Sequence, residues 1–145
     1  MSIPQGVTDL LGRYCELVDT ADWDALGEMF ARGALADEHG NEIARGSRAV
    51  AAFYRDGTRL YDGAPRTKHI VSSTVVEGAE DGLLVARSSF LVLQATDDFP
   101  LQPIICGRYR DTFSADGDSW AFAERRFAVD LVGDLSRHLT YELRS

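Results

Sequence analysis

The sequence has few cysteines and no excess of basic residues. Its two cysteines, Cys15 and Cys106, lie far apart among 145 residues and form neither a CxxC pair nor the spacing of a zinc site. Both are interpreted as small buried apolar side chains rather than as ligands or nucleophiles. The formal net charge of −8 argues against a nucleic-acid surface, because phosphate binding needs a basic stripe.

Long apolar runs are also missing. No run approaches the roughly 20 apolar residues that a membrane-spanning helix needs. The opening segment, 1–14, has neither the basic region nor the apolar centre of a signal peptide. We therefore expect a cytoplasmic protein with no membrane partner.

Motifs for bound cofactors are absent as well. The sequence contains no phosphate loop, dinucleotide fingerprint or Ser-His-Asp nucleophile motif. Its three histidines, His39, His69 and His138, are scattered and do not favour a metal site. These observations predict chemistry on a small-molecule substrate without a cofactor or a metal.

What is present is an ordinary globular composition. Hydrophobic residues make up 45% of the chain and charged residues 26%, which is far from the composition of a disordered protein. The length suits one domain with its own core, so we predict a single domain over residues 1–145.

The first half of the chain reads as helices. Apolar residues at helical spacing predict an amphipathic helix over 4–19. Asp22 is placed to cap a short second helix that begins at Trp23. A third helix is predicted to start with Ser47 as its cap and to continue its inner face to Tyr61.

The other segments read as strands with turn residues between them. Strands that follow helices imply an antiparallel α+β domain with its helices on one face of the sheet. If the sheet is strongly curved, helices on its concave side enclose a pocket suited to a small ligand. The predicted strands are 34–37, 42–45, 67–77, 83–94, 104–114 and 120–131.

Two segments, 14–24 and 66–74, resemble the SnoaL-like branch of the nuclear-transport-factor-2-like (NTF2-like) superfamily. Within it they are most similar to scytalone dehydratase, bile-acid 7α-dehydratase and hexachlorocyclohexane dehydrochlorinase. The order of elements resembles the family over nearly the whole chain, whereas the residue-level match is confined to these short motifs. The resemblance implies a cone in which three N-terminal helices pack on a strongly curved, mainly antiparallel sheet.

Asp19 and His69 are the predicted catalytic pair. They match the positions at which those enzymes place an aspartate that orients a histidine, and the histidine removes a proton from the substrate. Histidine is well suited to moving protons near neutral pH, and a carboxylate on its other ring nitrogen fixes the tautomer. The alternative is a satisfied core histidine beside a helix-end carboxylate.

Tyr14 and Arg125 are predicted to bind substrate. The resemblance places a polar pocket residue at Tyr14, whose phenol would stabilise developing negative charge. Strand alternation lets only one of Arg125 and Arg126 point inward, and the resemblance favours Arg125 as the ligand of a substrate anion. A structural salt bridge is the alternative for Arg125.

Other residues are expected to line the cavity. Arg87 lies in an otherwise apolar or small strand and is expected to reach the pocket. Asp37 falls near the base of ketosteroid isomerase, a member of the same superfamily, but its surroundings differ. His39 is expected in an exposed turn, and His138 either covers the pocket mouth or is disordered. The remaining predicted lining residues are Trp23, Phe53, Tyr54 and Phe90.

Three functions fit this pattern. The first is a cofactor-independent lyase, dehydratase-like, or an isomerase that uses the Asp-His pair on a small, mostly apolar substrate. The second is a polyketide cyclase of SnoaL type, and the third is a non-catalytic ligand-binding or assembly module like a ring-hydroxylating dioxygenase small subunit. Scytalone itself is not expected as substrate, because the segment 85–89 lacks that enzyme's second histidine. We also expect a homodimer or homotrimer, since apolar residues occur on both faces of the strands.

Overall fold

A computed structural model describes residues 2–143, so Met1, Arg144 and Ser145 of the predicted domain lie outside the described residues. The order of elements is the predicted one; the first two strands have the predicted bounds, and the last four are longer than expected. The elements are α1 (Gln5–Asp19), α2 (Trp23–Glu28), β1 (Ala34–Asp37), β2 (Glu42–Arg45), α3 (Gly46–Gly57), β3 (Thr67–Glu80), β4 (Leu83–Thr96), β5 (Phe99–Asp116) and β6 (Ser119–Val132).

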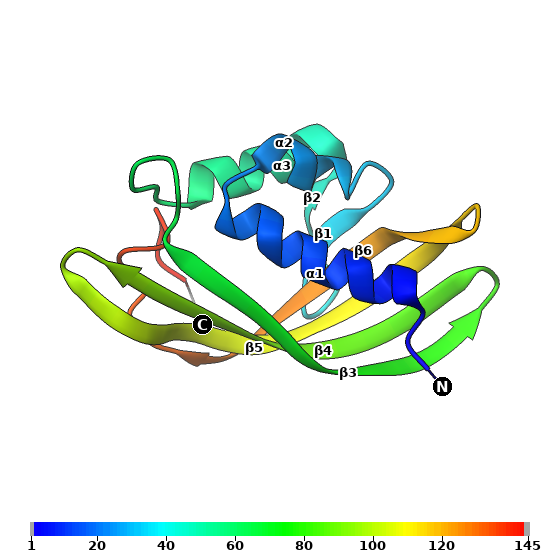
Figure 1. The fold of residues 1–145 in the computed structure, drawn as a ribbon. Coiled ribbons are helices and arrows are strands. Elements are labelled where there is room, and N and C mark those ends of the chain that lie inside the picture. The colour runs from blue at the N-terminus through cyan, green and yellow to red at the C-terminus, as the bar shows by residue number, and fades with distance from the viewer. Residues whose placement is uncertain (1, 144–145) are drawn as a thin grey trace.

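The strands form one sheet in the order β2-β1-β6-β5-β4-β3. Neighbouring strands are antiparallel except β1 and β6, which run parallel. Register shifts interrupt every antiparallel pair, and an extra residue on one strand bends it and increases its twist. The result is a curved sheet whose concave side carries α1, with α2 and α3 beyond it (Figure 1). The predicted α+β cone is thus confirmed.

Local sequence signals predicted the start of α2 correctly and the start of α3 incorrectly. Asp22 caps α2, because its carboxylate accepts a hydrogen bond from the Ala25 N–H at 3.3 Å. The predicted cap Ser47 is wrong: α3 already begins at Gly46, which has φ +85° and lets the chain turn directly out of β2. The predicted extension of α3 to Tyr61 is also wrong, since the helix ends at Gly57.

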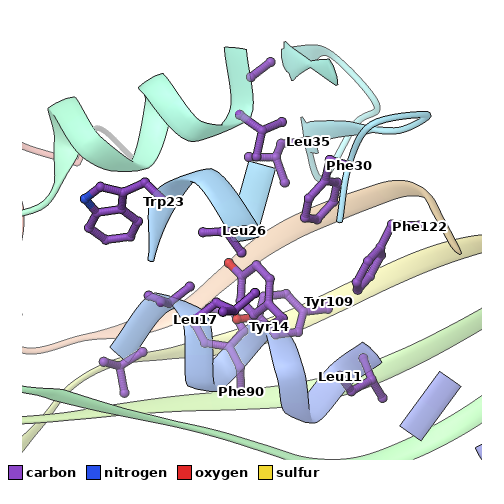
Figure 2. Packing of buried hydrophobic residues seen from close by; sticks show 14 of the residues in the cluster. Leu11, Tyr14, Leu17, Trp23, Leu26, Phe30, Leu35, Phe90, Tyr109 and Phe122 are labelled. Carbon is purple, nitrogen blue, oxygen red and sulfur yellow. The ribbon is translucent and has the colours of Figure 1, made fainter. Parts of the chain in front are cut away.

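The core lies between α1, α2 and the concave face of the sheet (Figure 2). Its aromatic members come from both layers: the rings of Phe30 and Phe122 stack with centroids 4.8 Å apart, and those of Phe90 and Tyr109 at 4.5 Å. A Cβ on Gly27 of α2 would lie 2.3 Å from a backbone oxygen of α3, so glycine allows these helices to approach closely. This packing fixes the helices over the sheet.

After β6, the chain folds back over one end of the cone (Figure 1). This C-terminal segment, 133–143, pairs with the residues that follow α3: Thr58 and Leu139 form an isolated β-bridge, and the Arg59 N–H donates to the His138 carbonyl at 2.8 Å. The same pairing draws Thr58 into an extended conformation, which explains why α3 stops before it. Of the helices in residues 2–143, none has the length and apolar character to cross a membrane.

Candidate active site

The end of α1 meets the start of β3 through Asp19 and His69. The Asp19 carboxylate accepts two hydrogen bonds from His69, one from the ring nitrogen Nδ1 at 2.6 Å and one from the backbone N–H at 2.9 Å. The Thr67 hydroxyl donates to the same carboxylate at 2.9 Å. Both side chains are nearly enclosed, with 8% of His69 and 14% of Asp19 exposed. Alternation along β3 turns His69 inward, and the end of α1 at Asp19 brings the carboxylate to it.

These hydrogen bonds decide the charge of Asp19. Burial works to raise the pKa of Asp19, but the His69 ring, its charge, its backbone N–H and the Thr67 hydroxyl together hold that pKa below its ordinary value. An ionised carboxylate only accepts hydrogen bonds, so Nδ1 of His69 carries the hydrogen. In the neutral ring, Nε2 then has the free lone pair of a general base.

His69 lines a cavity of about 210 Å³ inside the cone. Its walls come from α1, α3, β2, β3, β4, β5, β6 and the C-terminal segment, and they are mostly apolar. Asp19 does not line the cavity but lies behind His69, where it bonds the nitrogen that faces away from the ligand space. The lining residues are Tyr14, Ile43, Phe53, Tyr54, His69, Phe90, Val92, Ile105, Tyr109, Phe127, Val129, Leu135, His138, Leu139, Tyr141 and Leu143.

Tyr14 and Tyr54 share a short hydrogen bond between their hydroxyl groups in the cavity wall. Burial raises the pKa of Tyr14, partly opposed by the charge of Arg125, and burial and the neighbouring Tyr14 raise the pKa of Tyr54 well above its ordinary value. Both phenols therefore keep their hydrogens near neutral pH. One hydrogen is used between them, so the pair has a second O–H to donate.

The sequence model of the SnoaL-like domain matches residues 5–126. The chain belongs to the SnoaL-like domain family. Its structure is similar to ActVI-ORFA from Streptomyces coelicolor, with a TM-score of 0.72 and 18% identity over 87% of this chain and 96% of that one.

Two structures from Novosphingobium aromaticivorans are also similar. One is described as a candidate scytalone dehydratase, with a TM-score of 0.71 and 18% identity over 97% of this chain and 89% of that one. The other is an NTF2-like protein with a cystatin-like fold, with a TM-score of 0.69 and 22% identity over 86% and 80% of the two chains. At these identities the likeness shows the shared NTF2-like fold.

In this SnoaL-like cone, only two of three apolar residues predicted as substrate contacts line the cavity, and the third lies behind the wall. Phe53 and Phe90 line the cavity. Trp23 does not: it is buried behind Tyr54, and the two rings stack with an interplanar angle of 11° and centroids 6.2 Å apart. Trp23 thus supports the wall from outside, which corrects the expectation that it contacts substrate.

Arg125 points inward but binds another residue. Its guanidinium donates from Nε and Nη2 to the two carboxylate oxygens of Asp111 at 2.8 and 2.9 Å, and both side chains are fully buried. Its Cζ lies 3.6 Å from the ring centroid of Tyr109 and 4.3 Å from that of Tyr14. Arg125 is absent from the cavity lining. The expectation that it contacts a substrate anion is therefore corrected: Arg125 forms a buried ion pair with Asp111 beneath the tyrosines.

Arg87 lies on the opposite side of the sheet. Side chains alternate between the two faces of β4, and residue 87 falls on the outward face. The Arg87 side chain is therefore 59% exposed, and its Nε lies 3.6 Å from the Glu77 carboxylate. It borders a depression of about 270 Å³ on the outer face that is larger than the cone cavity but contains neither His69 nor Asp19. The expectation that Arg87 reaches the pocket is corrected.

The β1–β2 turn contributes nothing to the cavity. The Asp37 carboxylate accepts hydrogen bonds from the backbone N–H groups of His39 and Asn41 at 2.9 Å each. Asp37 therefore stabilises its own turn. His39 is exposed in that turn, as predicted. Neither residue is among those that line the cavity with His69.

Two further residues line the cavity: Tyr109, which was not among the predicted lining residues, and His138, which was expected either to cover the pocket mouth or to be disordered. Tyr109 falls on the inward phase of β5, and its ring forms part of the cavity wall. His138 is 8% exposed, and its ring centroid lies 6.2 Å from that of His69. No group of three or more His, Cys, Asp or Glu side chains in residues 2–143 is arranged to hold a metal ion.

Proposed function

We propose that this chain is a cofactor-independent lyase of the dehydratase kind, or an isomerase, in which His69 removes a proton from a small, mostly apolar substrate. The observation that carries the proposal is the Nδ1 contact of 2.6 Å between His69 and Asp19 at the edge of an apolar cavity. This contact leaves Nε2 as the base, and no residue in the range 2–143 occupies it with a hydrogen bond. General base help of this kind typically contributes about 10²–10⁴-fold to a rate.

The first step is proton transfer from a substrate carbon to Nε2 of His69. The imidazolium that forms is stabilised by the Asp19 carboxylate, which stays ionised. If the carbon lies next to a carbonyl, negative charge develops on the carbonyl oxygen. The spare O–H of the Tyr14–Tyr54 pair is suited to donate to that oxygen.

The second step returns the proton from His69. If a hydroxyl group is β to the carbonyl, the proton goes to that hydroxyl as its C–O bond breaks, water leaves and a double bond remains. If no leaving group is present, the proton goes to another carbon and the product is an isomer. A cyclase would use the same base, with the carbanion attacking a second carbonyl of the same substrate. Turnover by any of these routes falls once acid protonates Nε2.

The decisive experiment measures proton abstraction directly. A panel of small β-hydroxy ketones and ketones is incubated with the protein in D₂O, and exchange at the carbon next to the carbonyl and loss of water are followed by NMR. His69→Ala is expected to lower the rate by about 10²-fold or more. His39→Ala is the matched control, because His39 lies in the exposed turn and should leave the rate unchanged.

Two results would overturn the proposal. If His69→Ala exchanges the proton as fast as the native protein, another group is the base. If no panel member is exchanged, dehydrated or isomerised by the native protein, the non-catalytic reading of a ligand-binding or assembly module is favoured instead.

A further inference from the structure

His138 is a buried histidine whose ring has no polar partner of its own. Nδ1 is fully buried without a hydrogen-bond partner in the described part of the chain, and no hydrogen bond to the other ring nitrogen occurs there either. Buried polar atoms in native proteins are nearly always paired, because an unpaired one costs free energy. The ring is nevertheless part of the cavity wall, where it lies edge-to-face beside the His69 ring with the two centroids 6.2 Å apart, and it takes no part in the Asp19–His69 hydrogen bond.

The position of His138 is fixed by its backbone. The Arg59 N–H donates to the His138 carbonyl at 2.8 Å, and the preceding carbonyl, that of Arg137, accepts from the Tyr61 hydroxyl at 2.6 Å and from Gln94 Nε2 at 2.9 Å. The His138 N–H donates to the Leu135 carbonyl at 3.0 Å. The imidazole is therefore held at the cavity by neighbours on both sides, as a ligand-contacting residue must be.

His138 is uncharged near neutral pH. Burial lowers the pKa of His138 to about 4, with a further contribution from the charge of His69 that Asp19 partly opposes. The other titratable groups of the cavity wall are tyrosines, which keep their hydrogens; they are Tyr14, Tyr54, Tyr109 and Tyr141. No lysine or arginine is among the lining residues, and Arg125 is already committed to Asp111.

We propose that His138 is a ligand-binding residue that hydrogen-bonds a second, uncharged polar group of the substrate, close to the group that contacts His69. The proposal rests on the proposed function for the identity of the reacting end. A neutral imidazole offers one donor and one acceptor, which fits a hydroxyl or a carbonyl group and disfavours a carboxylate.

The cavity then defines a class of ligand. Its volume of about 210 Å³ lies below the roughly 300–1,000 Å³ of pockets for drug-sized molecules, so the ligand is small. Its apolar wall requires an apolar skeleton, and the two neighbouring histidines favour two polar groups on that skeleton. Uncharged ring compounds with a ketone and a hydroxyl group meet these conditions.

Binding measurements test the proposal without requiring turnover. The probes are meta- and para-hydroxyacetophenone, acetophenone as the ligand with a single polar group, and para-hydroxybenzoate as the charged ligand, each titrated calorimetrically at pH 6.5. We expect at least one hydroxyacetophenone to bind about 3–10-fold more tightly than acetophenone, the gain that one hydrogen bond gives. The benzoate should bind more weakly than either hydroxyacetophenone.

Variants assign that gain to His138. His138→Phe keeps a ring of similar shape and should remove the preference for the hydroxyl group, whereas His138→Gln keeps a donor and an acceptor and should retain part of it. His39→Ala should bind all probes as the native protein does, and circular dichroism verifies that each variant is folded. The ¹⁵N resonances of the His138 ring should shift with hydroxyacetophenone and much less with acetophenone.

The outcomes separate this proposal from the proposed function. If His69→Ala is catalytically inactive yet binds the probes with the native preference, His138 acts in binding alone, as proposed. If His138→Phe retains the native preference, if para-hydroxybenzoate binds most tightly, or if no uncharged probe binds at millimolar concentration, the role of His138 is overturned whatever His69 does.

Discussion

The Asp19 carboxylate holds His69 twice, by the ring Nδ1 at 2.6 Å and by the backbone N–H at 2.9 Å. Because one group fixes both the main chain and the far end of the side chain, the ring has little freedom to rotate. The direction of the Nε2 lone pair is thus set before a ligand enters, which would lower the entropic cost of the proposed proton transfer.

Replacement of Asp19 by asparagine should keep this shape but reverse the tautomer. The amide NH₂ would donate to Nδ1, which places the ring hydrogen on Nε2 and removes the free base. We expect the rate to fall by about 10²–10⁴-fold. The double variant Asp19→Asn/His69→Ala should be little slower than His69→Ala alone, because the two residues act as one unit. If the fold-losses in rate of the two single variants multiply in the double variant, the two residues act independently and do not form a dyad.

Loss of either phenol should impair catalysis without opening the core. Tyr14→Phe and Tyr54→Phe keep the rings but break the shared hydrogen bond, so the remaining phenol is no longer held in position by its partner. Removal of one such donor from a site that stabilises negative charge typically costs about 10²–10³-fold in rate. Steady-state kinetics should show the loss in kcat rather than in KM. A change confined to KM would mean that the tyrosines only bind the ground state.

The Arg125–Asp111 pair should matter for stability rather than for substrate charge. Asp111→Asn leaves a buried guanidinium without its counter-ion, and breaking a buried pair in this way costs about 3–5 kcal/mol. The double variant Arg125→Met/Asp111→Leu should recover much of that loss, because it removes both charges. Urea unfolding of the three proteins measures this. An equally unstable double variant would show that the arginine's packing on Tyr14 and Tyr109 outweighs the charges.

His138 should make stability sensitive to acid. The folded-state pKa of about 4 lies below the ordinary histidine value of 6.5, so the unfolded chain binds the proton first. Its contribution is fully present above pH 6.5 and is lost as the pH falls towards 4, on the order of 3 kcal/mol for a shift of this size. Urea unfolding at pH 7, 5 and 4 should show a smaller loss for His138→Phe. Parallel pH profiles of the two proteins would contradict a neutral buried His138.

Self-association is the remaining prediction. Leu101 and Leu131 are 71% and 69% exposed near one end of β5 and β6, and large exposed apolar side chains of this kind often mark an interface. We expect light scattering at micromolar concentration to give the mass of a dimer or trimer, and Leu101→Asp/Leu131→Asp to reduce it. A monomeric native protein would contradict the expectation.

Much of the fold could be predicted because its signals are local. Helical spacing in α1, the cap at Asp22 and the strand alternation that turns His69 inward are each readable within a few residues. Arg125 shows the limit: alternation predicts that it points inward, but its partner Asp111 comes from another strand, so spacing cannot distinguish an ion pair from a substrate contact. For His138 the sequence left two expectations open, a cover of the pocket mouth or disorder, because the backbone hydrogen bonds that carry it to the cavity leave no side-chain pattern.

The family match ends at residue 126, whereas the segment that closes the cone runs from 133 to 143. The proposed Asp19–His69 pair lies inside the matched range, whereas His138 and its neighbours in the cavity wall lie outside it. If the proposed function holds, substitutions in this segment would change the cavity wall without replacing the residues proposed to move the proton. A comparison of this chain with other family members that have an aspartate and a histidine at these positions would therefore need to include the segment that corresponds to 133–143.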